Sequence, residues 1–106
     1  MTKQELFDFH KQCTEKMLEI SKKKNSDYTG AGANPFANFE MVEHLGITST
    51  EIGIMTRLSD KMSRLSSLLK KQNEVADESI EDTILDAANY LLILAAFLHD
   101  KKKEVN

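Results

Sequence analysis

Apolar residues recur along the chain at alternating steps of three and four, the spacing of one face of an α-helix. In residues 3–23 these positions are Leu6, Phe9 or His10, Cys13, Met17 and Ile20. The spacing predicts a first helix over 3–23. The three lysines at 22–24 then place positive charge at the carboxyl end of its dipole.

Residues 24–34 are polar and break this pattern. Gly30 and Gly32 can adopt positive φ angles there, so the segment is predicted to be a loop. Asn34 followed by Pro35 is typical of a helix cap and a first helical turn. A short helix with an apolar face is therefore expected next, and Gly46 is expected to end it; its apolar residues are Phe36, Phe39 and Val42.

Two longer helices are predicted in the second half of the chain. The third runs from Ser49 or Thr50 to Gln72, with a stripe of Met55, Leu58, Met62, Leu65 and Leu69. The fourth runs from a cap at Asp77 to about Lys101, with a stripe of Ile80, Ile84, Ala87, Leu91, Leu94 and Leu98. The five-residue connection makes the two helices antiparallel neighbours. The predicted fold is a single all-α domain over 1–106, a small helical bundle built on this long helix hairpin.

Composition supports this fold class. One proline and four glycines in 106 residues supply too few turns for an all-β chain. A net charge of −3 argues against a partner that is a nucleic-acid polymer. The lone Cys13, together with the lack of a signal peptide or a long apolar run, predicts a cytoplasmic protein without a membrane association.

The fourth predicted helix is apolar nearly all round from Ala87 to Leu98, where only Asn89 and Tyr90 interrupt it. A helix without a polar face is covered on all sides. A chain of 106 residues can hardly cover every side of it alone. The sequence therefore predicts a homo-oligomer with this helix in the interface.

Polar residues of the two long helices form two stripes. The fourth helix carries a row with a spacing close to four, Glu78, Asp82, Asp86 and Asn89. The third helix carries Arg57, Asp60, Lys61 and Arg64 on one stripe. Like charges four residues apart destabilise a helix, so the carboxylates need cations nearby. In the predicted hairpin the two stripes meet at similar heights.

Two interpretations of these stripes are open. In the first, Arg57, Lys61 and Arg64 neutralise the two aspartates Asp82 and Asp86 in an interhelical ion-pair network without a ligand. In the second, four carboxylates hold Mg²⁺ and the basic residues meet the phosphates of a nucleotide. Mg²⁺ binds one or two carboxylates and completes its octahedron with water and phosphate oxygens. The four candidate ligands are Asp60, Glu78, Asp82 and Asp86.

The predicted loop and the helix after it form a second candidate cluster. Its members are Lys24, Asp27, Tyr28, Asn34, Pro35, Phe36, Asn38 and Phe39. Loop glycines let backbone amides approach phosphates, aromatic rings can stack a base, and Asn38 could read a base edge. The alternative is that Phe36 and Phe39 only pack the short helix onto the bundle.

Three segments in order resemble the nucleotide-modification-associated domain of phages and prophages. They are Lys24-Asn-Ser-Asp-Tyr with Asn34-Pro-Phe-Ala-Asn-Phe, then Gly53 to Leu65, then Asp77 to Tyr90. That family is grouped with the MazG-like all-α nucleoside triphosphate pyrophosphatases. The resemblance covers roughly residues 22–95.

The resemblance implies a dimer or tetramer and Mg²⁺-dependent hydrolysis of a nucleoside triphosphate to the monophosphate and pyrophosphate. In the superfamily, a Glu-x-x-Glu pair and a Glu-x-x-Asp pair hold the metal. Asp86, with Tyr90 four residues on, matches the last aspartate, whereas Thr83 stands at the glutamate position. The first pair is replaced by Arg57-Leu-Ser-Asp60. A site with fewer carboxylates and more cations can clamp phosphates without activating water.

Three hypotheses follow. The first is an enzyme with Asp60, Lys61 and Asp86 as catalytic residues, and it expects Mg²⁺ on the four carboxylates named above. Its substrate-binding residues are Lys24, Asp27, Tyr28, Phe36, Asn38, Arg57, Arg64 and Asn89. The second hypothesis is a phage protein that sequesters a nucleotide, such as a cyclic immune signal, in the host cytoplasm. The third is an interaction protein whose hairpin only oligomerises.

Overall fold

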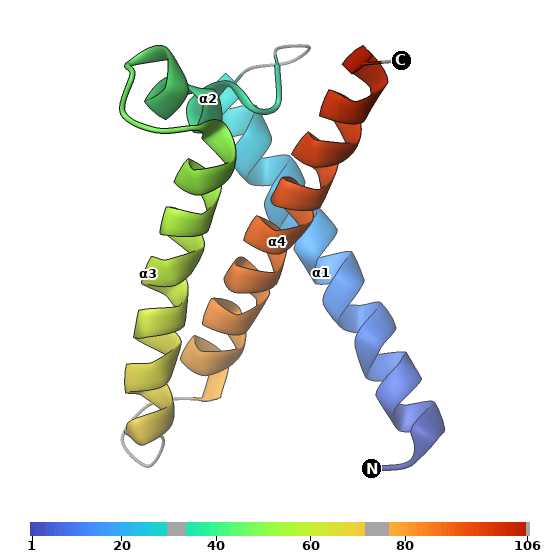
Figure 1. Ribbon diagram of the computed structural model, residues 1–106. Coiled ribbons are helices and arrows are strands. Elements are labelled where there is room, and N and C mark those ends of the chain that lie inside the picture. Colours follow the sequence, from blue (N-terminus) through green and yellow to red (C-terminus); the bar gives the residue numbers. More distant parts are fainter. Residues whose placement is uncertain (30–33, 72–76, 106) are drawn as a thin grey trace. The chain divides into compact units, whose positions relative to one another are not determined.

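The structure is a computed structural model that describes residues 1–29, 34–71 and 77–105, with side chains described in 1–24, 34–71 and 80–103. Over these residues the chain forms helices and no strand (Figure 1). The helices are α1 (Lys3–Thr29), α2 (Ala37–His44), α3 (Thr50–Lys70) and α4 (Asp77–Val105). The all-α prediction is confirmed. None of the helices in the described residues is long and apolar enough to span a membrane.

The first helix is longer than its apolar pattern predicts. α1 continues to Thr29, so the expectation of a loop over residues 24–34 was wrong for 24–29, while residues 30–33 lie outside the described residues. The segment between Lys3 and Thr29 has neither glycine nor proline, and Gly30 follows directly. Asparagine, serine and aspartate cost only about 0.7 kcal/mol or less each inside a helix, so a helix that is already formed can extend through them.

The short helix α2 begins at Ala37, with Phe36 rather than Asn34 in the N-cap position. Its carboxyl end was predicted correctly. Gly46 has a φ of 74°, its amide donates to the Glu43 carbonyl at 3.0 Å, and the Ile47 amide donates to the Val42 carbonyl at 2.9 Å. These two bonds form a Schellman motif, which ends a helix at a residue in the left-handed region.

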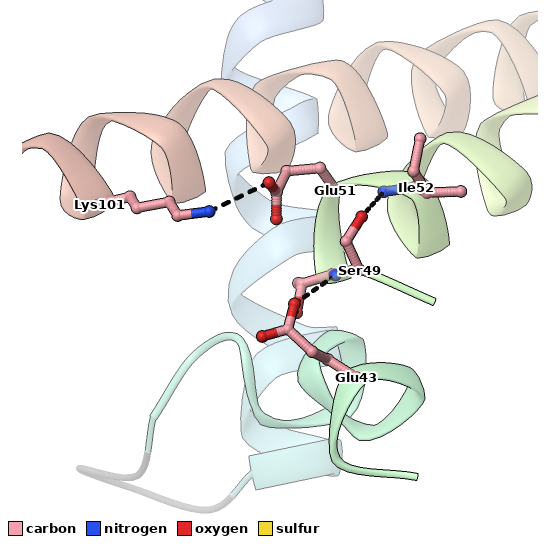
Figure 2. Close-up of polar contacts among 6 residues, drawn as sticks. Glu43, Ser49, Glu51, Ile52 and Lys101 are labelled. Carbon is pink, nitrogen blue, oxygen red and sulfur yellow. Dashed lines mark hydrogen bonds and ion pairs between the residues drawn. The ribbon is translucent and has the colours of Figure 1, made fainter. Parts of the chain in front are cut away.

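The start of α3 is fixed by two side chains. The Ser49 hydroxyl accepts a hydrogen bond from the Ile52 amide at 3.2 Å, as expected of an N-cap serine. The Glu43 carboxylate of α2 accepts from the Thr50 amide at 2.9 Å and from the Thr50 hydroxyl at 3.3 Å (Figure 2). These bonds give acceptors to amides that would have no hydrogen-bond partner at an isolated helix end, and the bonds from Glu43 also join α2 to α3.

The chain divides into two compact units, Met1–Pro35 and Phe36–Asn106, each described by itself. The first consists mainly of α1, whose apolar stripe includes the exposed residues Leu6 and Phe9. In the second unit α3 contacts both α2 and α4, and α3 and α4 lie side by side (Figure 1). The candidate site residues with described contacts belong to this second unit.

The apolar positions that face inward differ from the predicted stripes. On α3, Ile54 and Leu58 are buried. Three members of the predicted stripe are instead about half exposed, namely Met55, Met62 and Leu69. On α4, Ala87 is buried as predicted, whereas Ile84, Leu91 and Leu98 are exposed. Each long helix has two adjoining apolar stripes, and periodicity alone does not tell which of them faces inward.

Candidate functional site

An ion pair joins the two polar stripes of the long helices. The Lys61 ammonium of α3 lies 3.4 Å from a carboxylate oxygen of Asp86 on α4, and the two side chains are only 30% and 23% exposed. Partial burial strengthens the attraction, because water screens the charges less than it does at a fully exposed site. Of the ion-pair network predicted from the sequence, this link between Lys61 and Asp86 is confirmed.

One helical turn away, three helices meet in a stack of a cation and two rings. The Arg57 guanidinium of α3 lies 4.7 Å from the centre of the Phe39 ring of α2. That ring packs edge-on against Tyr90 of α4, with 6.3 Å between ring centres. Both distances are typical of cation–π and aromatic contacts. We call Phe39, Arg57, Lys61, Asp86 and Tyr90 the polar cluster.

A further set of contacts lies near the start of α3. The Lys101 ammonium pairs with the Glu51 carboxylate at 3.1 Å (Figure 2) and lies 5.9 Å from the centre of the Phe97 ring. Phe97 in turn packs edge-on against Phe36, with 5.3 Å between ring centres. The packing role that the sequence offered for Phe36 and Phe39 is therefore confirmed, since each ring contacts an aromatic ring of α4.

Glu51 is the described group with a resolved pKa shift. A backbone hydrogen bond in the first turn of α3 lowers its pKa below 4.5, and the Lys101 ammonium lowers the pKa further, against the opposing effect of burial. Both causes favour the ionised carboxylate. The Glu51 oxygen that does not face Lys101 is buried and accepts no hydrogen bond from the described residues.

The remaining predicted site residues are dispersed. Asp60 and Arg64 of α3 and Asp82 of α4 are exposed, whereas Asn38 is half-buried and Asn89 is 7% exposed. The half-buried Lys24 belongs to the unit Met1–Pro35, so its place beside the polar cluster remains a prediction. The side chains of Asp27, Tyr28 and Glu78 lie outside the described residues.

The predicted carboxylate set does not come together as a whole. Within the residues whose side chains are described, no three histidine, cysteine, aspartate or glutamate side chains are grouped so that they could hold a metal ion. Asp60 follows the buried Leu58 by two residues, which turns it about 200° away from the inner face of α3. The predicted convergence of Asp60 with Asp82 and Asp86 is not found in this conformation.

Among the contact residues, Tyr90, Phe97, Glu51 and Lys101 were not identified as site residues from the sequence. Tyr90 interrupts an apolar run and appeared only as part of a motif, while Glu51 and Lys101 resemble ordinary helix-end charges. Glu51 and Lys101 are fifty residues apart, so no local spacing links them. For Tyr90 a signal was present, because a polar aromatic residue at a step of four from Asp86 lies on the same face of the helix.

Comparison of the chain with protein-family models, with curated proteins and with solved structures yields no match. Functional inference therefore depends on the polar cluster itself. The cluster offers two cations from α3, a carboxylate and an aromatic ring from α4, and a second aromatic ring from α2. Such a set can bind an anionic ligand that also has a flat apolar part.

Proposed function

We propose that the chain is a Mg²⁺-dependent nucleoside triphosphate pyrophosphohydrolase, acting on deoxynucleotides or ribonucleotides to give the monophosphate and pyrophosphate. The single observation that supports this most is the Lys61–Asp86 pair beside the Arg57–Phe39 contact. A triphosphate needs cations for its phosphates and a carboxylate for its metal. Here the Lys61 ammonium lies 3.4 Å from the Asp86 carboxylate, and Arg57 is one turn of α3 away from Lys61. The resemblance to the phage nucleotide-modification domain agrees with this chemistry.

The carboxylates of α4 fit the metal in a limited way. Asp82 and Asp86 are one turn apart on α4, and Mg²⁺ in nucleotide sites uses only one or two protein carboxylates. These two would hold the ion, and the sequence adds Glu78 and Asp60 as further candidates. Bound Mg²⁺ would polarise the phosphates and orient an attacking water.

The basic residues of α3 would act on the phosphates. Arg57, Lys61 and Arg64 are spaced so that they share one stripe of α3. Positive groups at fixed positions stabilise the negative charge that develops on the phosphates. Lys61 pairs with Asp86 without a ligand, so its ammonium is already held close to where the phosphates would bind. Lys24 is a further candidate cation.

Recognition of the base would fall to the segment around α2. Tyr28, Phe36 and Asn38 are proposed to line the base pocket, with Asp27 and Asn89 among the binding residues. Phe36 packs edge-on against Phe97 of α4, and this contact would hold one side of such a pocket in place. The protein is further proposed to be cytoplasmic and to form a dimer or a tetramer.

A second function is a nucleotide-sequestering protein without turnover, for example one that binds cyclic immune signals of a host. It is favoured by the excess of cations in the polar cluster, where Arg57 lies over the Phe39 ring and Lys61 pairs with Asp86, the one carboxylate of the cluster. A cyclic nucleotide needs cations and stacking surfaces but no metal.

The two functions separate when the protein is incubated with a panel of nucleoside triphosphates and cyclic nucleotides, with and without Mg²⁺. Pyrophosphate release that requires Mg²⁺ supports the enzyme. Recovery of an intact nucleotide after denaturation, from protein that releases no pyrophosphate, supports sequestration. No thermal shift and no turnover with any nucleotide contradicts both functions.

The substitution Asp86→Asn tests the proposed metal ligand, and Asp100→Asn on the exposed end of α4 is its matched control. As a ligand, Asp86 is needed for the thermal stabilisation that Mg²⁺ and a triphosphate give together, so Asp86→Asn should abolish it. If Asp86 only neutralises Lys61, the variant melts at a lower temperature without metal but keeps its nucleotide-dependent stabilisation. That second result would end the metal assignment.

A further inference from the structure

The two cations of the polar cluster are held in different ways. The Lys61 ammonium lies 3.4 Å from the Asp86 carboxylate, so a negative charge balances it. The Arg57 guanidinium lies 4.7 Å from the centre of the Phe39 ring, which has no formal charge. Among the described residues Arg57 forms neither an ion pair nor a hydrogen bond. Of the two cations, Arg57 is therefore the one without a carboxylate against it.

The acidic residues near this contact have other surroundings. Glu40 follows Phe39 on α2 and Asp60 follows Arg57 by three residues on α3, and within the described part of the chain neither pairs with Arg57. Glu43 accepts two hydrogen bonds from Thr50. The charge of Arg57 is thus left for a ligand from solution.

The Phe39 ring is fixed on two sides. It packs edge-on against Tyr90 of α4, with 6.3 Å between ring centres and 87° between ring planes. On the side of α3, a Cβ atom at Gly53 would lie 3.9 Å from the Phe39 carbonyl oxygen, so the backbones of α2 and α3 are close at this point. The ring is therefore a rigid surface against which the long Arg57 side chain rests.

An aromatic ring holds a guanidinium without occupying its hydrogen-bond donors. The attraction is between the positive charge and the face of the ring, whereas a carboxylate partner would accept hydrogen bonds from the N–H groups. The Phe39 contact also restricts Arg57 before a ligand arrives. A side chain that is already ordered loses less conformational entropy when the ligand binds.

We infer that Phe39 positions Arg57 to bind a phosphate group of the nucleotide without a metal ion. The N–H groups of a guanidinium form a planar fork that matches two oxygens of one phosphate. The inference rests on the nucleotide binding proposed above, which both proposed functions share, and not on hydrolysis. It adds Phe39 as a positioning residue and a phosphate contact that does not require Mg²⁺.

The probe is inorganic pyrophosphate in the presence of EDTA, because it contains phosphate groups without a base or a metal. Isothermal titration calorimetry should show that the wild type binds it. Arg57→Gln should weaken binding by about tenfold or more, because charge-assisted hydrogen bonds are lost. Phe39→Leu should weaken binding by about two- to tenfold, because the ligand then has to order Arg57. Phe39→Tyr keeps the ring and should bind as the wild type does.

The matched control is Phe97→Leu. Phe97 is half-buried like Phe39, packs edge-on against another ring and lies near a cation, Lys101. Its contacts do not include Arg57, so the affinity for pyrophosphate should stay unchanged. Thermal melts check that the variants are folded.

A double variant separates positioning from a structural role. If the ring acts only through the guanidinium, Phe39→Leu has no effect once Arg57 is replaced. The double variant Phe39→Leu with Arg57→Gln should therefore bind pyrophosphate no more weakly than Arg57→Gln alone.

A tryptophan variant keeps the test decisive if Phe39→Leu fails to fold. The chain contains no tryptophan, so Phe39→Trp places a single one beside Arg57. Its fluorescence should change when pyrophosphate is added with EDTA, and Arg57→Gln in this variant should remove the change. A fluorescence change that persists without Arg57 would contradict the inference.

A wild type that does not bind pyrophosphate in EDTA would overturn the inference, while Mg²⁺-dependent hydrolysis by the same protein would leave the proposed enzyme intact. Equal losses of affinity in Phe39→Leu and Phe97→Leu, or additive losses in the double variant, would also overturn it. The expected pattern in a protein that hydrolyses no triphosphate would support the inference and refute only the enzyme.

Discussion

Gly53 of α3 lies close to Val42 of α2, and its replacement by alanine tests how tightly the two helices pack. A Cβ atom at Gly53 would lie 2.6 Å from a methyl carbon of Val42. Carbon atoms in good contact are about 3.5–4.0 Å apart, so one of the two groups has to move by about 1 Å. Val42 cannot move easily, because a β-branched side chain in a helix has one preferred rotamer.

Two effects of opposite sign decide the outcome. Alanine is about 1 kcal/mol better than glycine inside a helix, whereas overpacking costs about 1–3 kcal/mol. We expect Gly53→Ala to lower the free energy of unfolding by about 1 kcal/mol, a fall in Tm of about 4–8 °C for a domain of this size. The assay is a thermal melt followed by circular dichroism. Protein concentration is held constant, because the Tm of an oligomer depends on it.

The control and the rescue use the same helices. Ser63→Ala, on an exposed position of α3, should raise Tm slightly through helix propensity alone. Adding Val42→Ala to Gly53→Ala makes room for the new methyl group, so the double variant should be more stable than the sum of the single effects, by about 1 kcal/mol or more. If Gly53→Ala raises Tm as Ser63→Ala does, the reasoning about close packing is wrong.

Two further predictions concern the ends of α3 and α2. A backbone hydrogen bond and the Lys101 ammonium lower the pKa of Glu51. The stability that the ionised Glu51 contributes is therefore fully present above pH 4.5 and is lost as the pH falls through the lowered pKa. Glu51→Gln should therefore lower the free energy of unfolding by about 0.5–1 kcal/mol at pH 7 and leave it unchanged at low pH, as measured by urea titration. An equal decrease at both pH values would contradict the lowered pKa of Glu51. Gly46→Ala should cost about 1–2 kcal/mol in the same titration, because the φ of 74° strains a residue with a Cβ atom, and an unchanged midpoint would contradict this.

The helices could be predicted from the sequence, whereas their inner faces could not. Four periodic segments separated by breaks are sufficient to predict four helices. On α3, however, the row Met55–Met62 is as apolar as the row Ile54–Leu58 beside it. The predicted stripe of α3 therefore combined the exposed Met55 and Met62 with the buried Leu58.

The candidate site was predictable where it depends on local spacing. Lys61 and Asp86 lie on stripes that the predicted hairpin brings to one height, and they do pair. The pair Glu51–Lys101 joins the start of α3 to the last part of α4, so predicting it requires the full length of both helices. The sequence predicted the end of α4 at about Lys101, whereas the helix extends four residues further, to Val105. Asp60 is exposed and lies about 200° round α3 from the buried Leu58, so its place on the predicted polar stripe did not determine which carboxylates it would join.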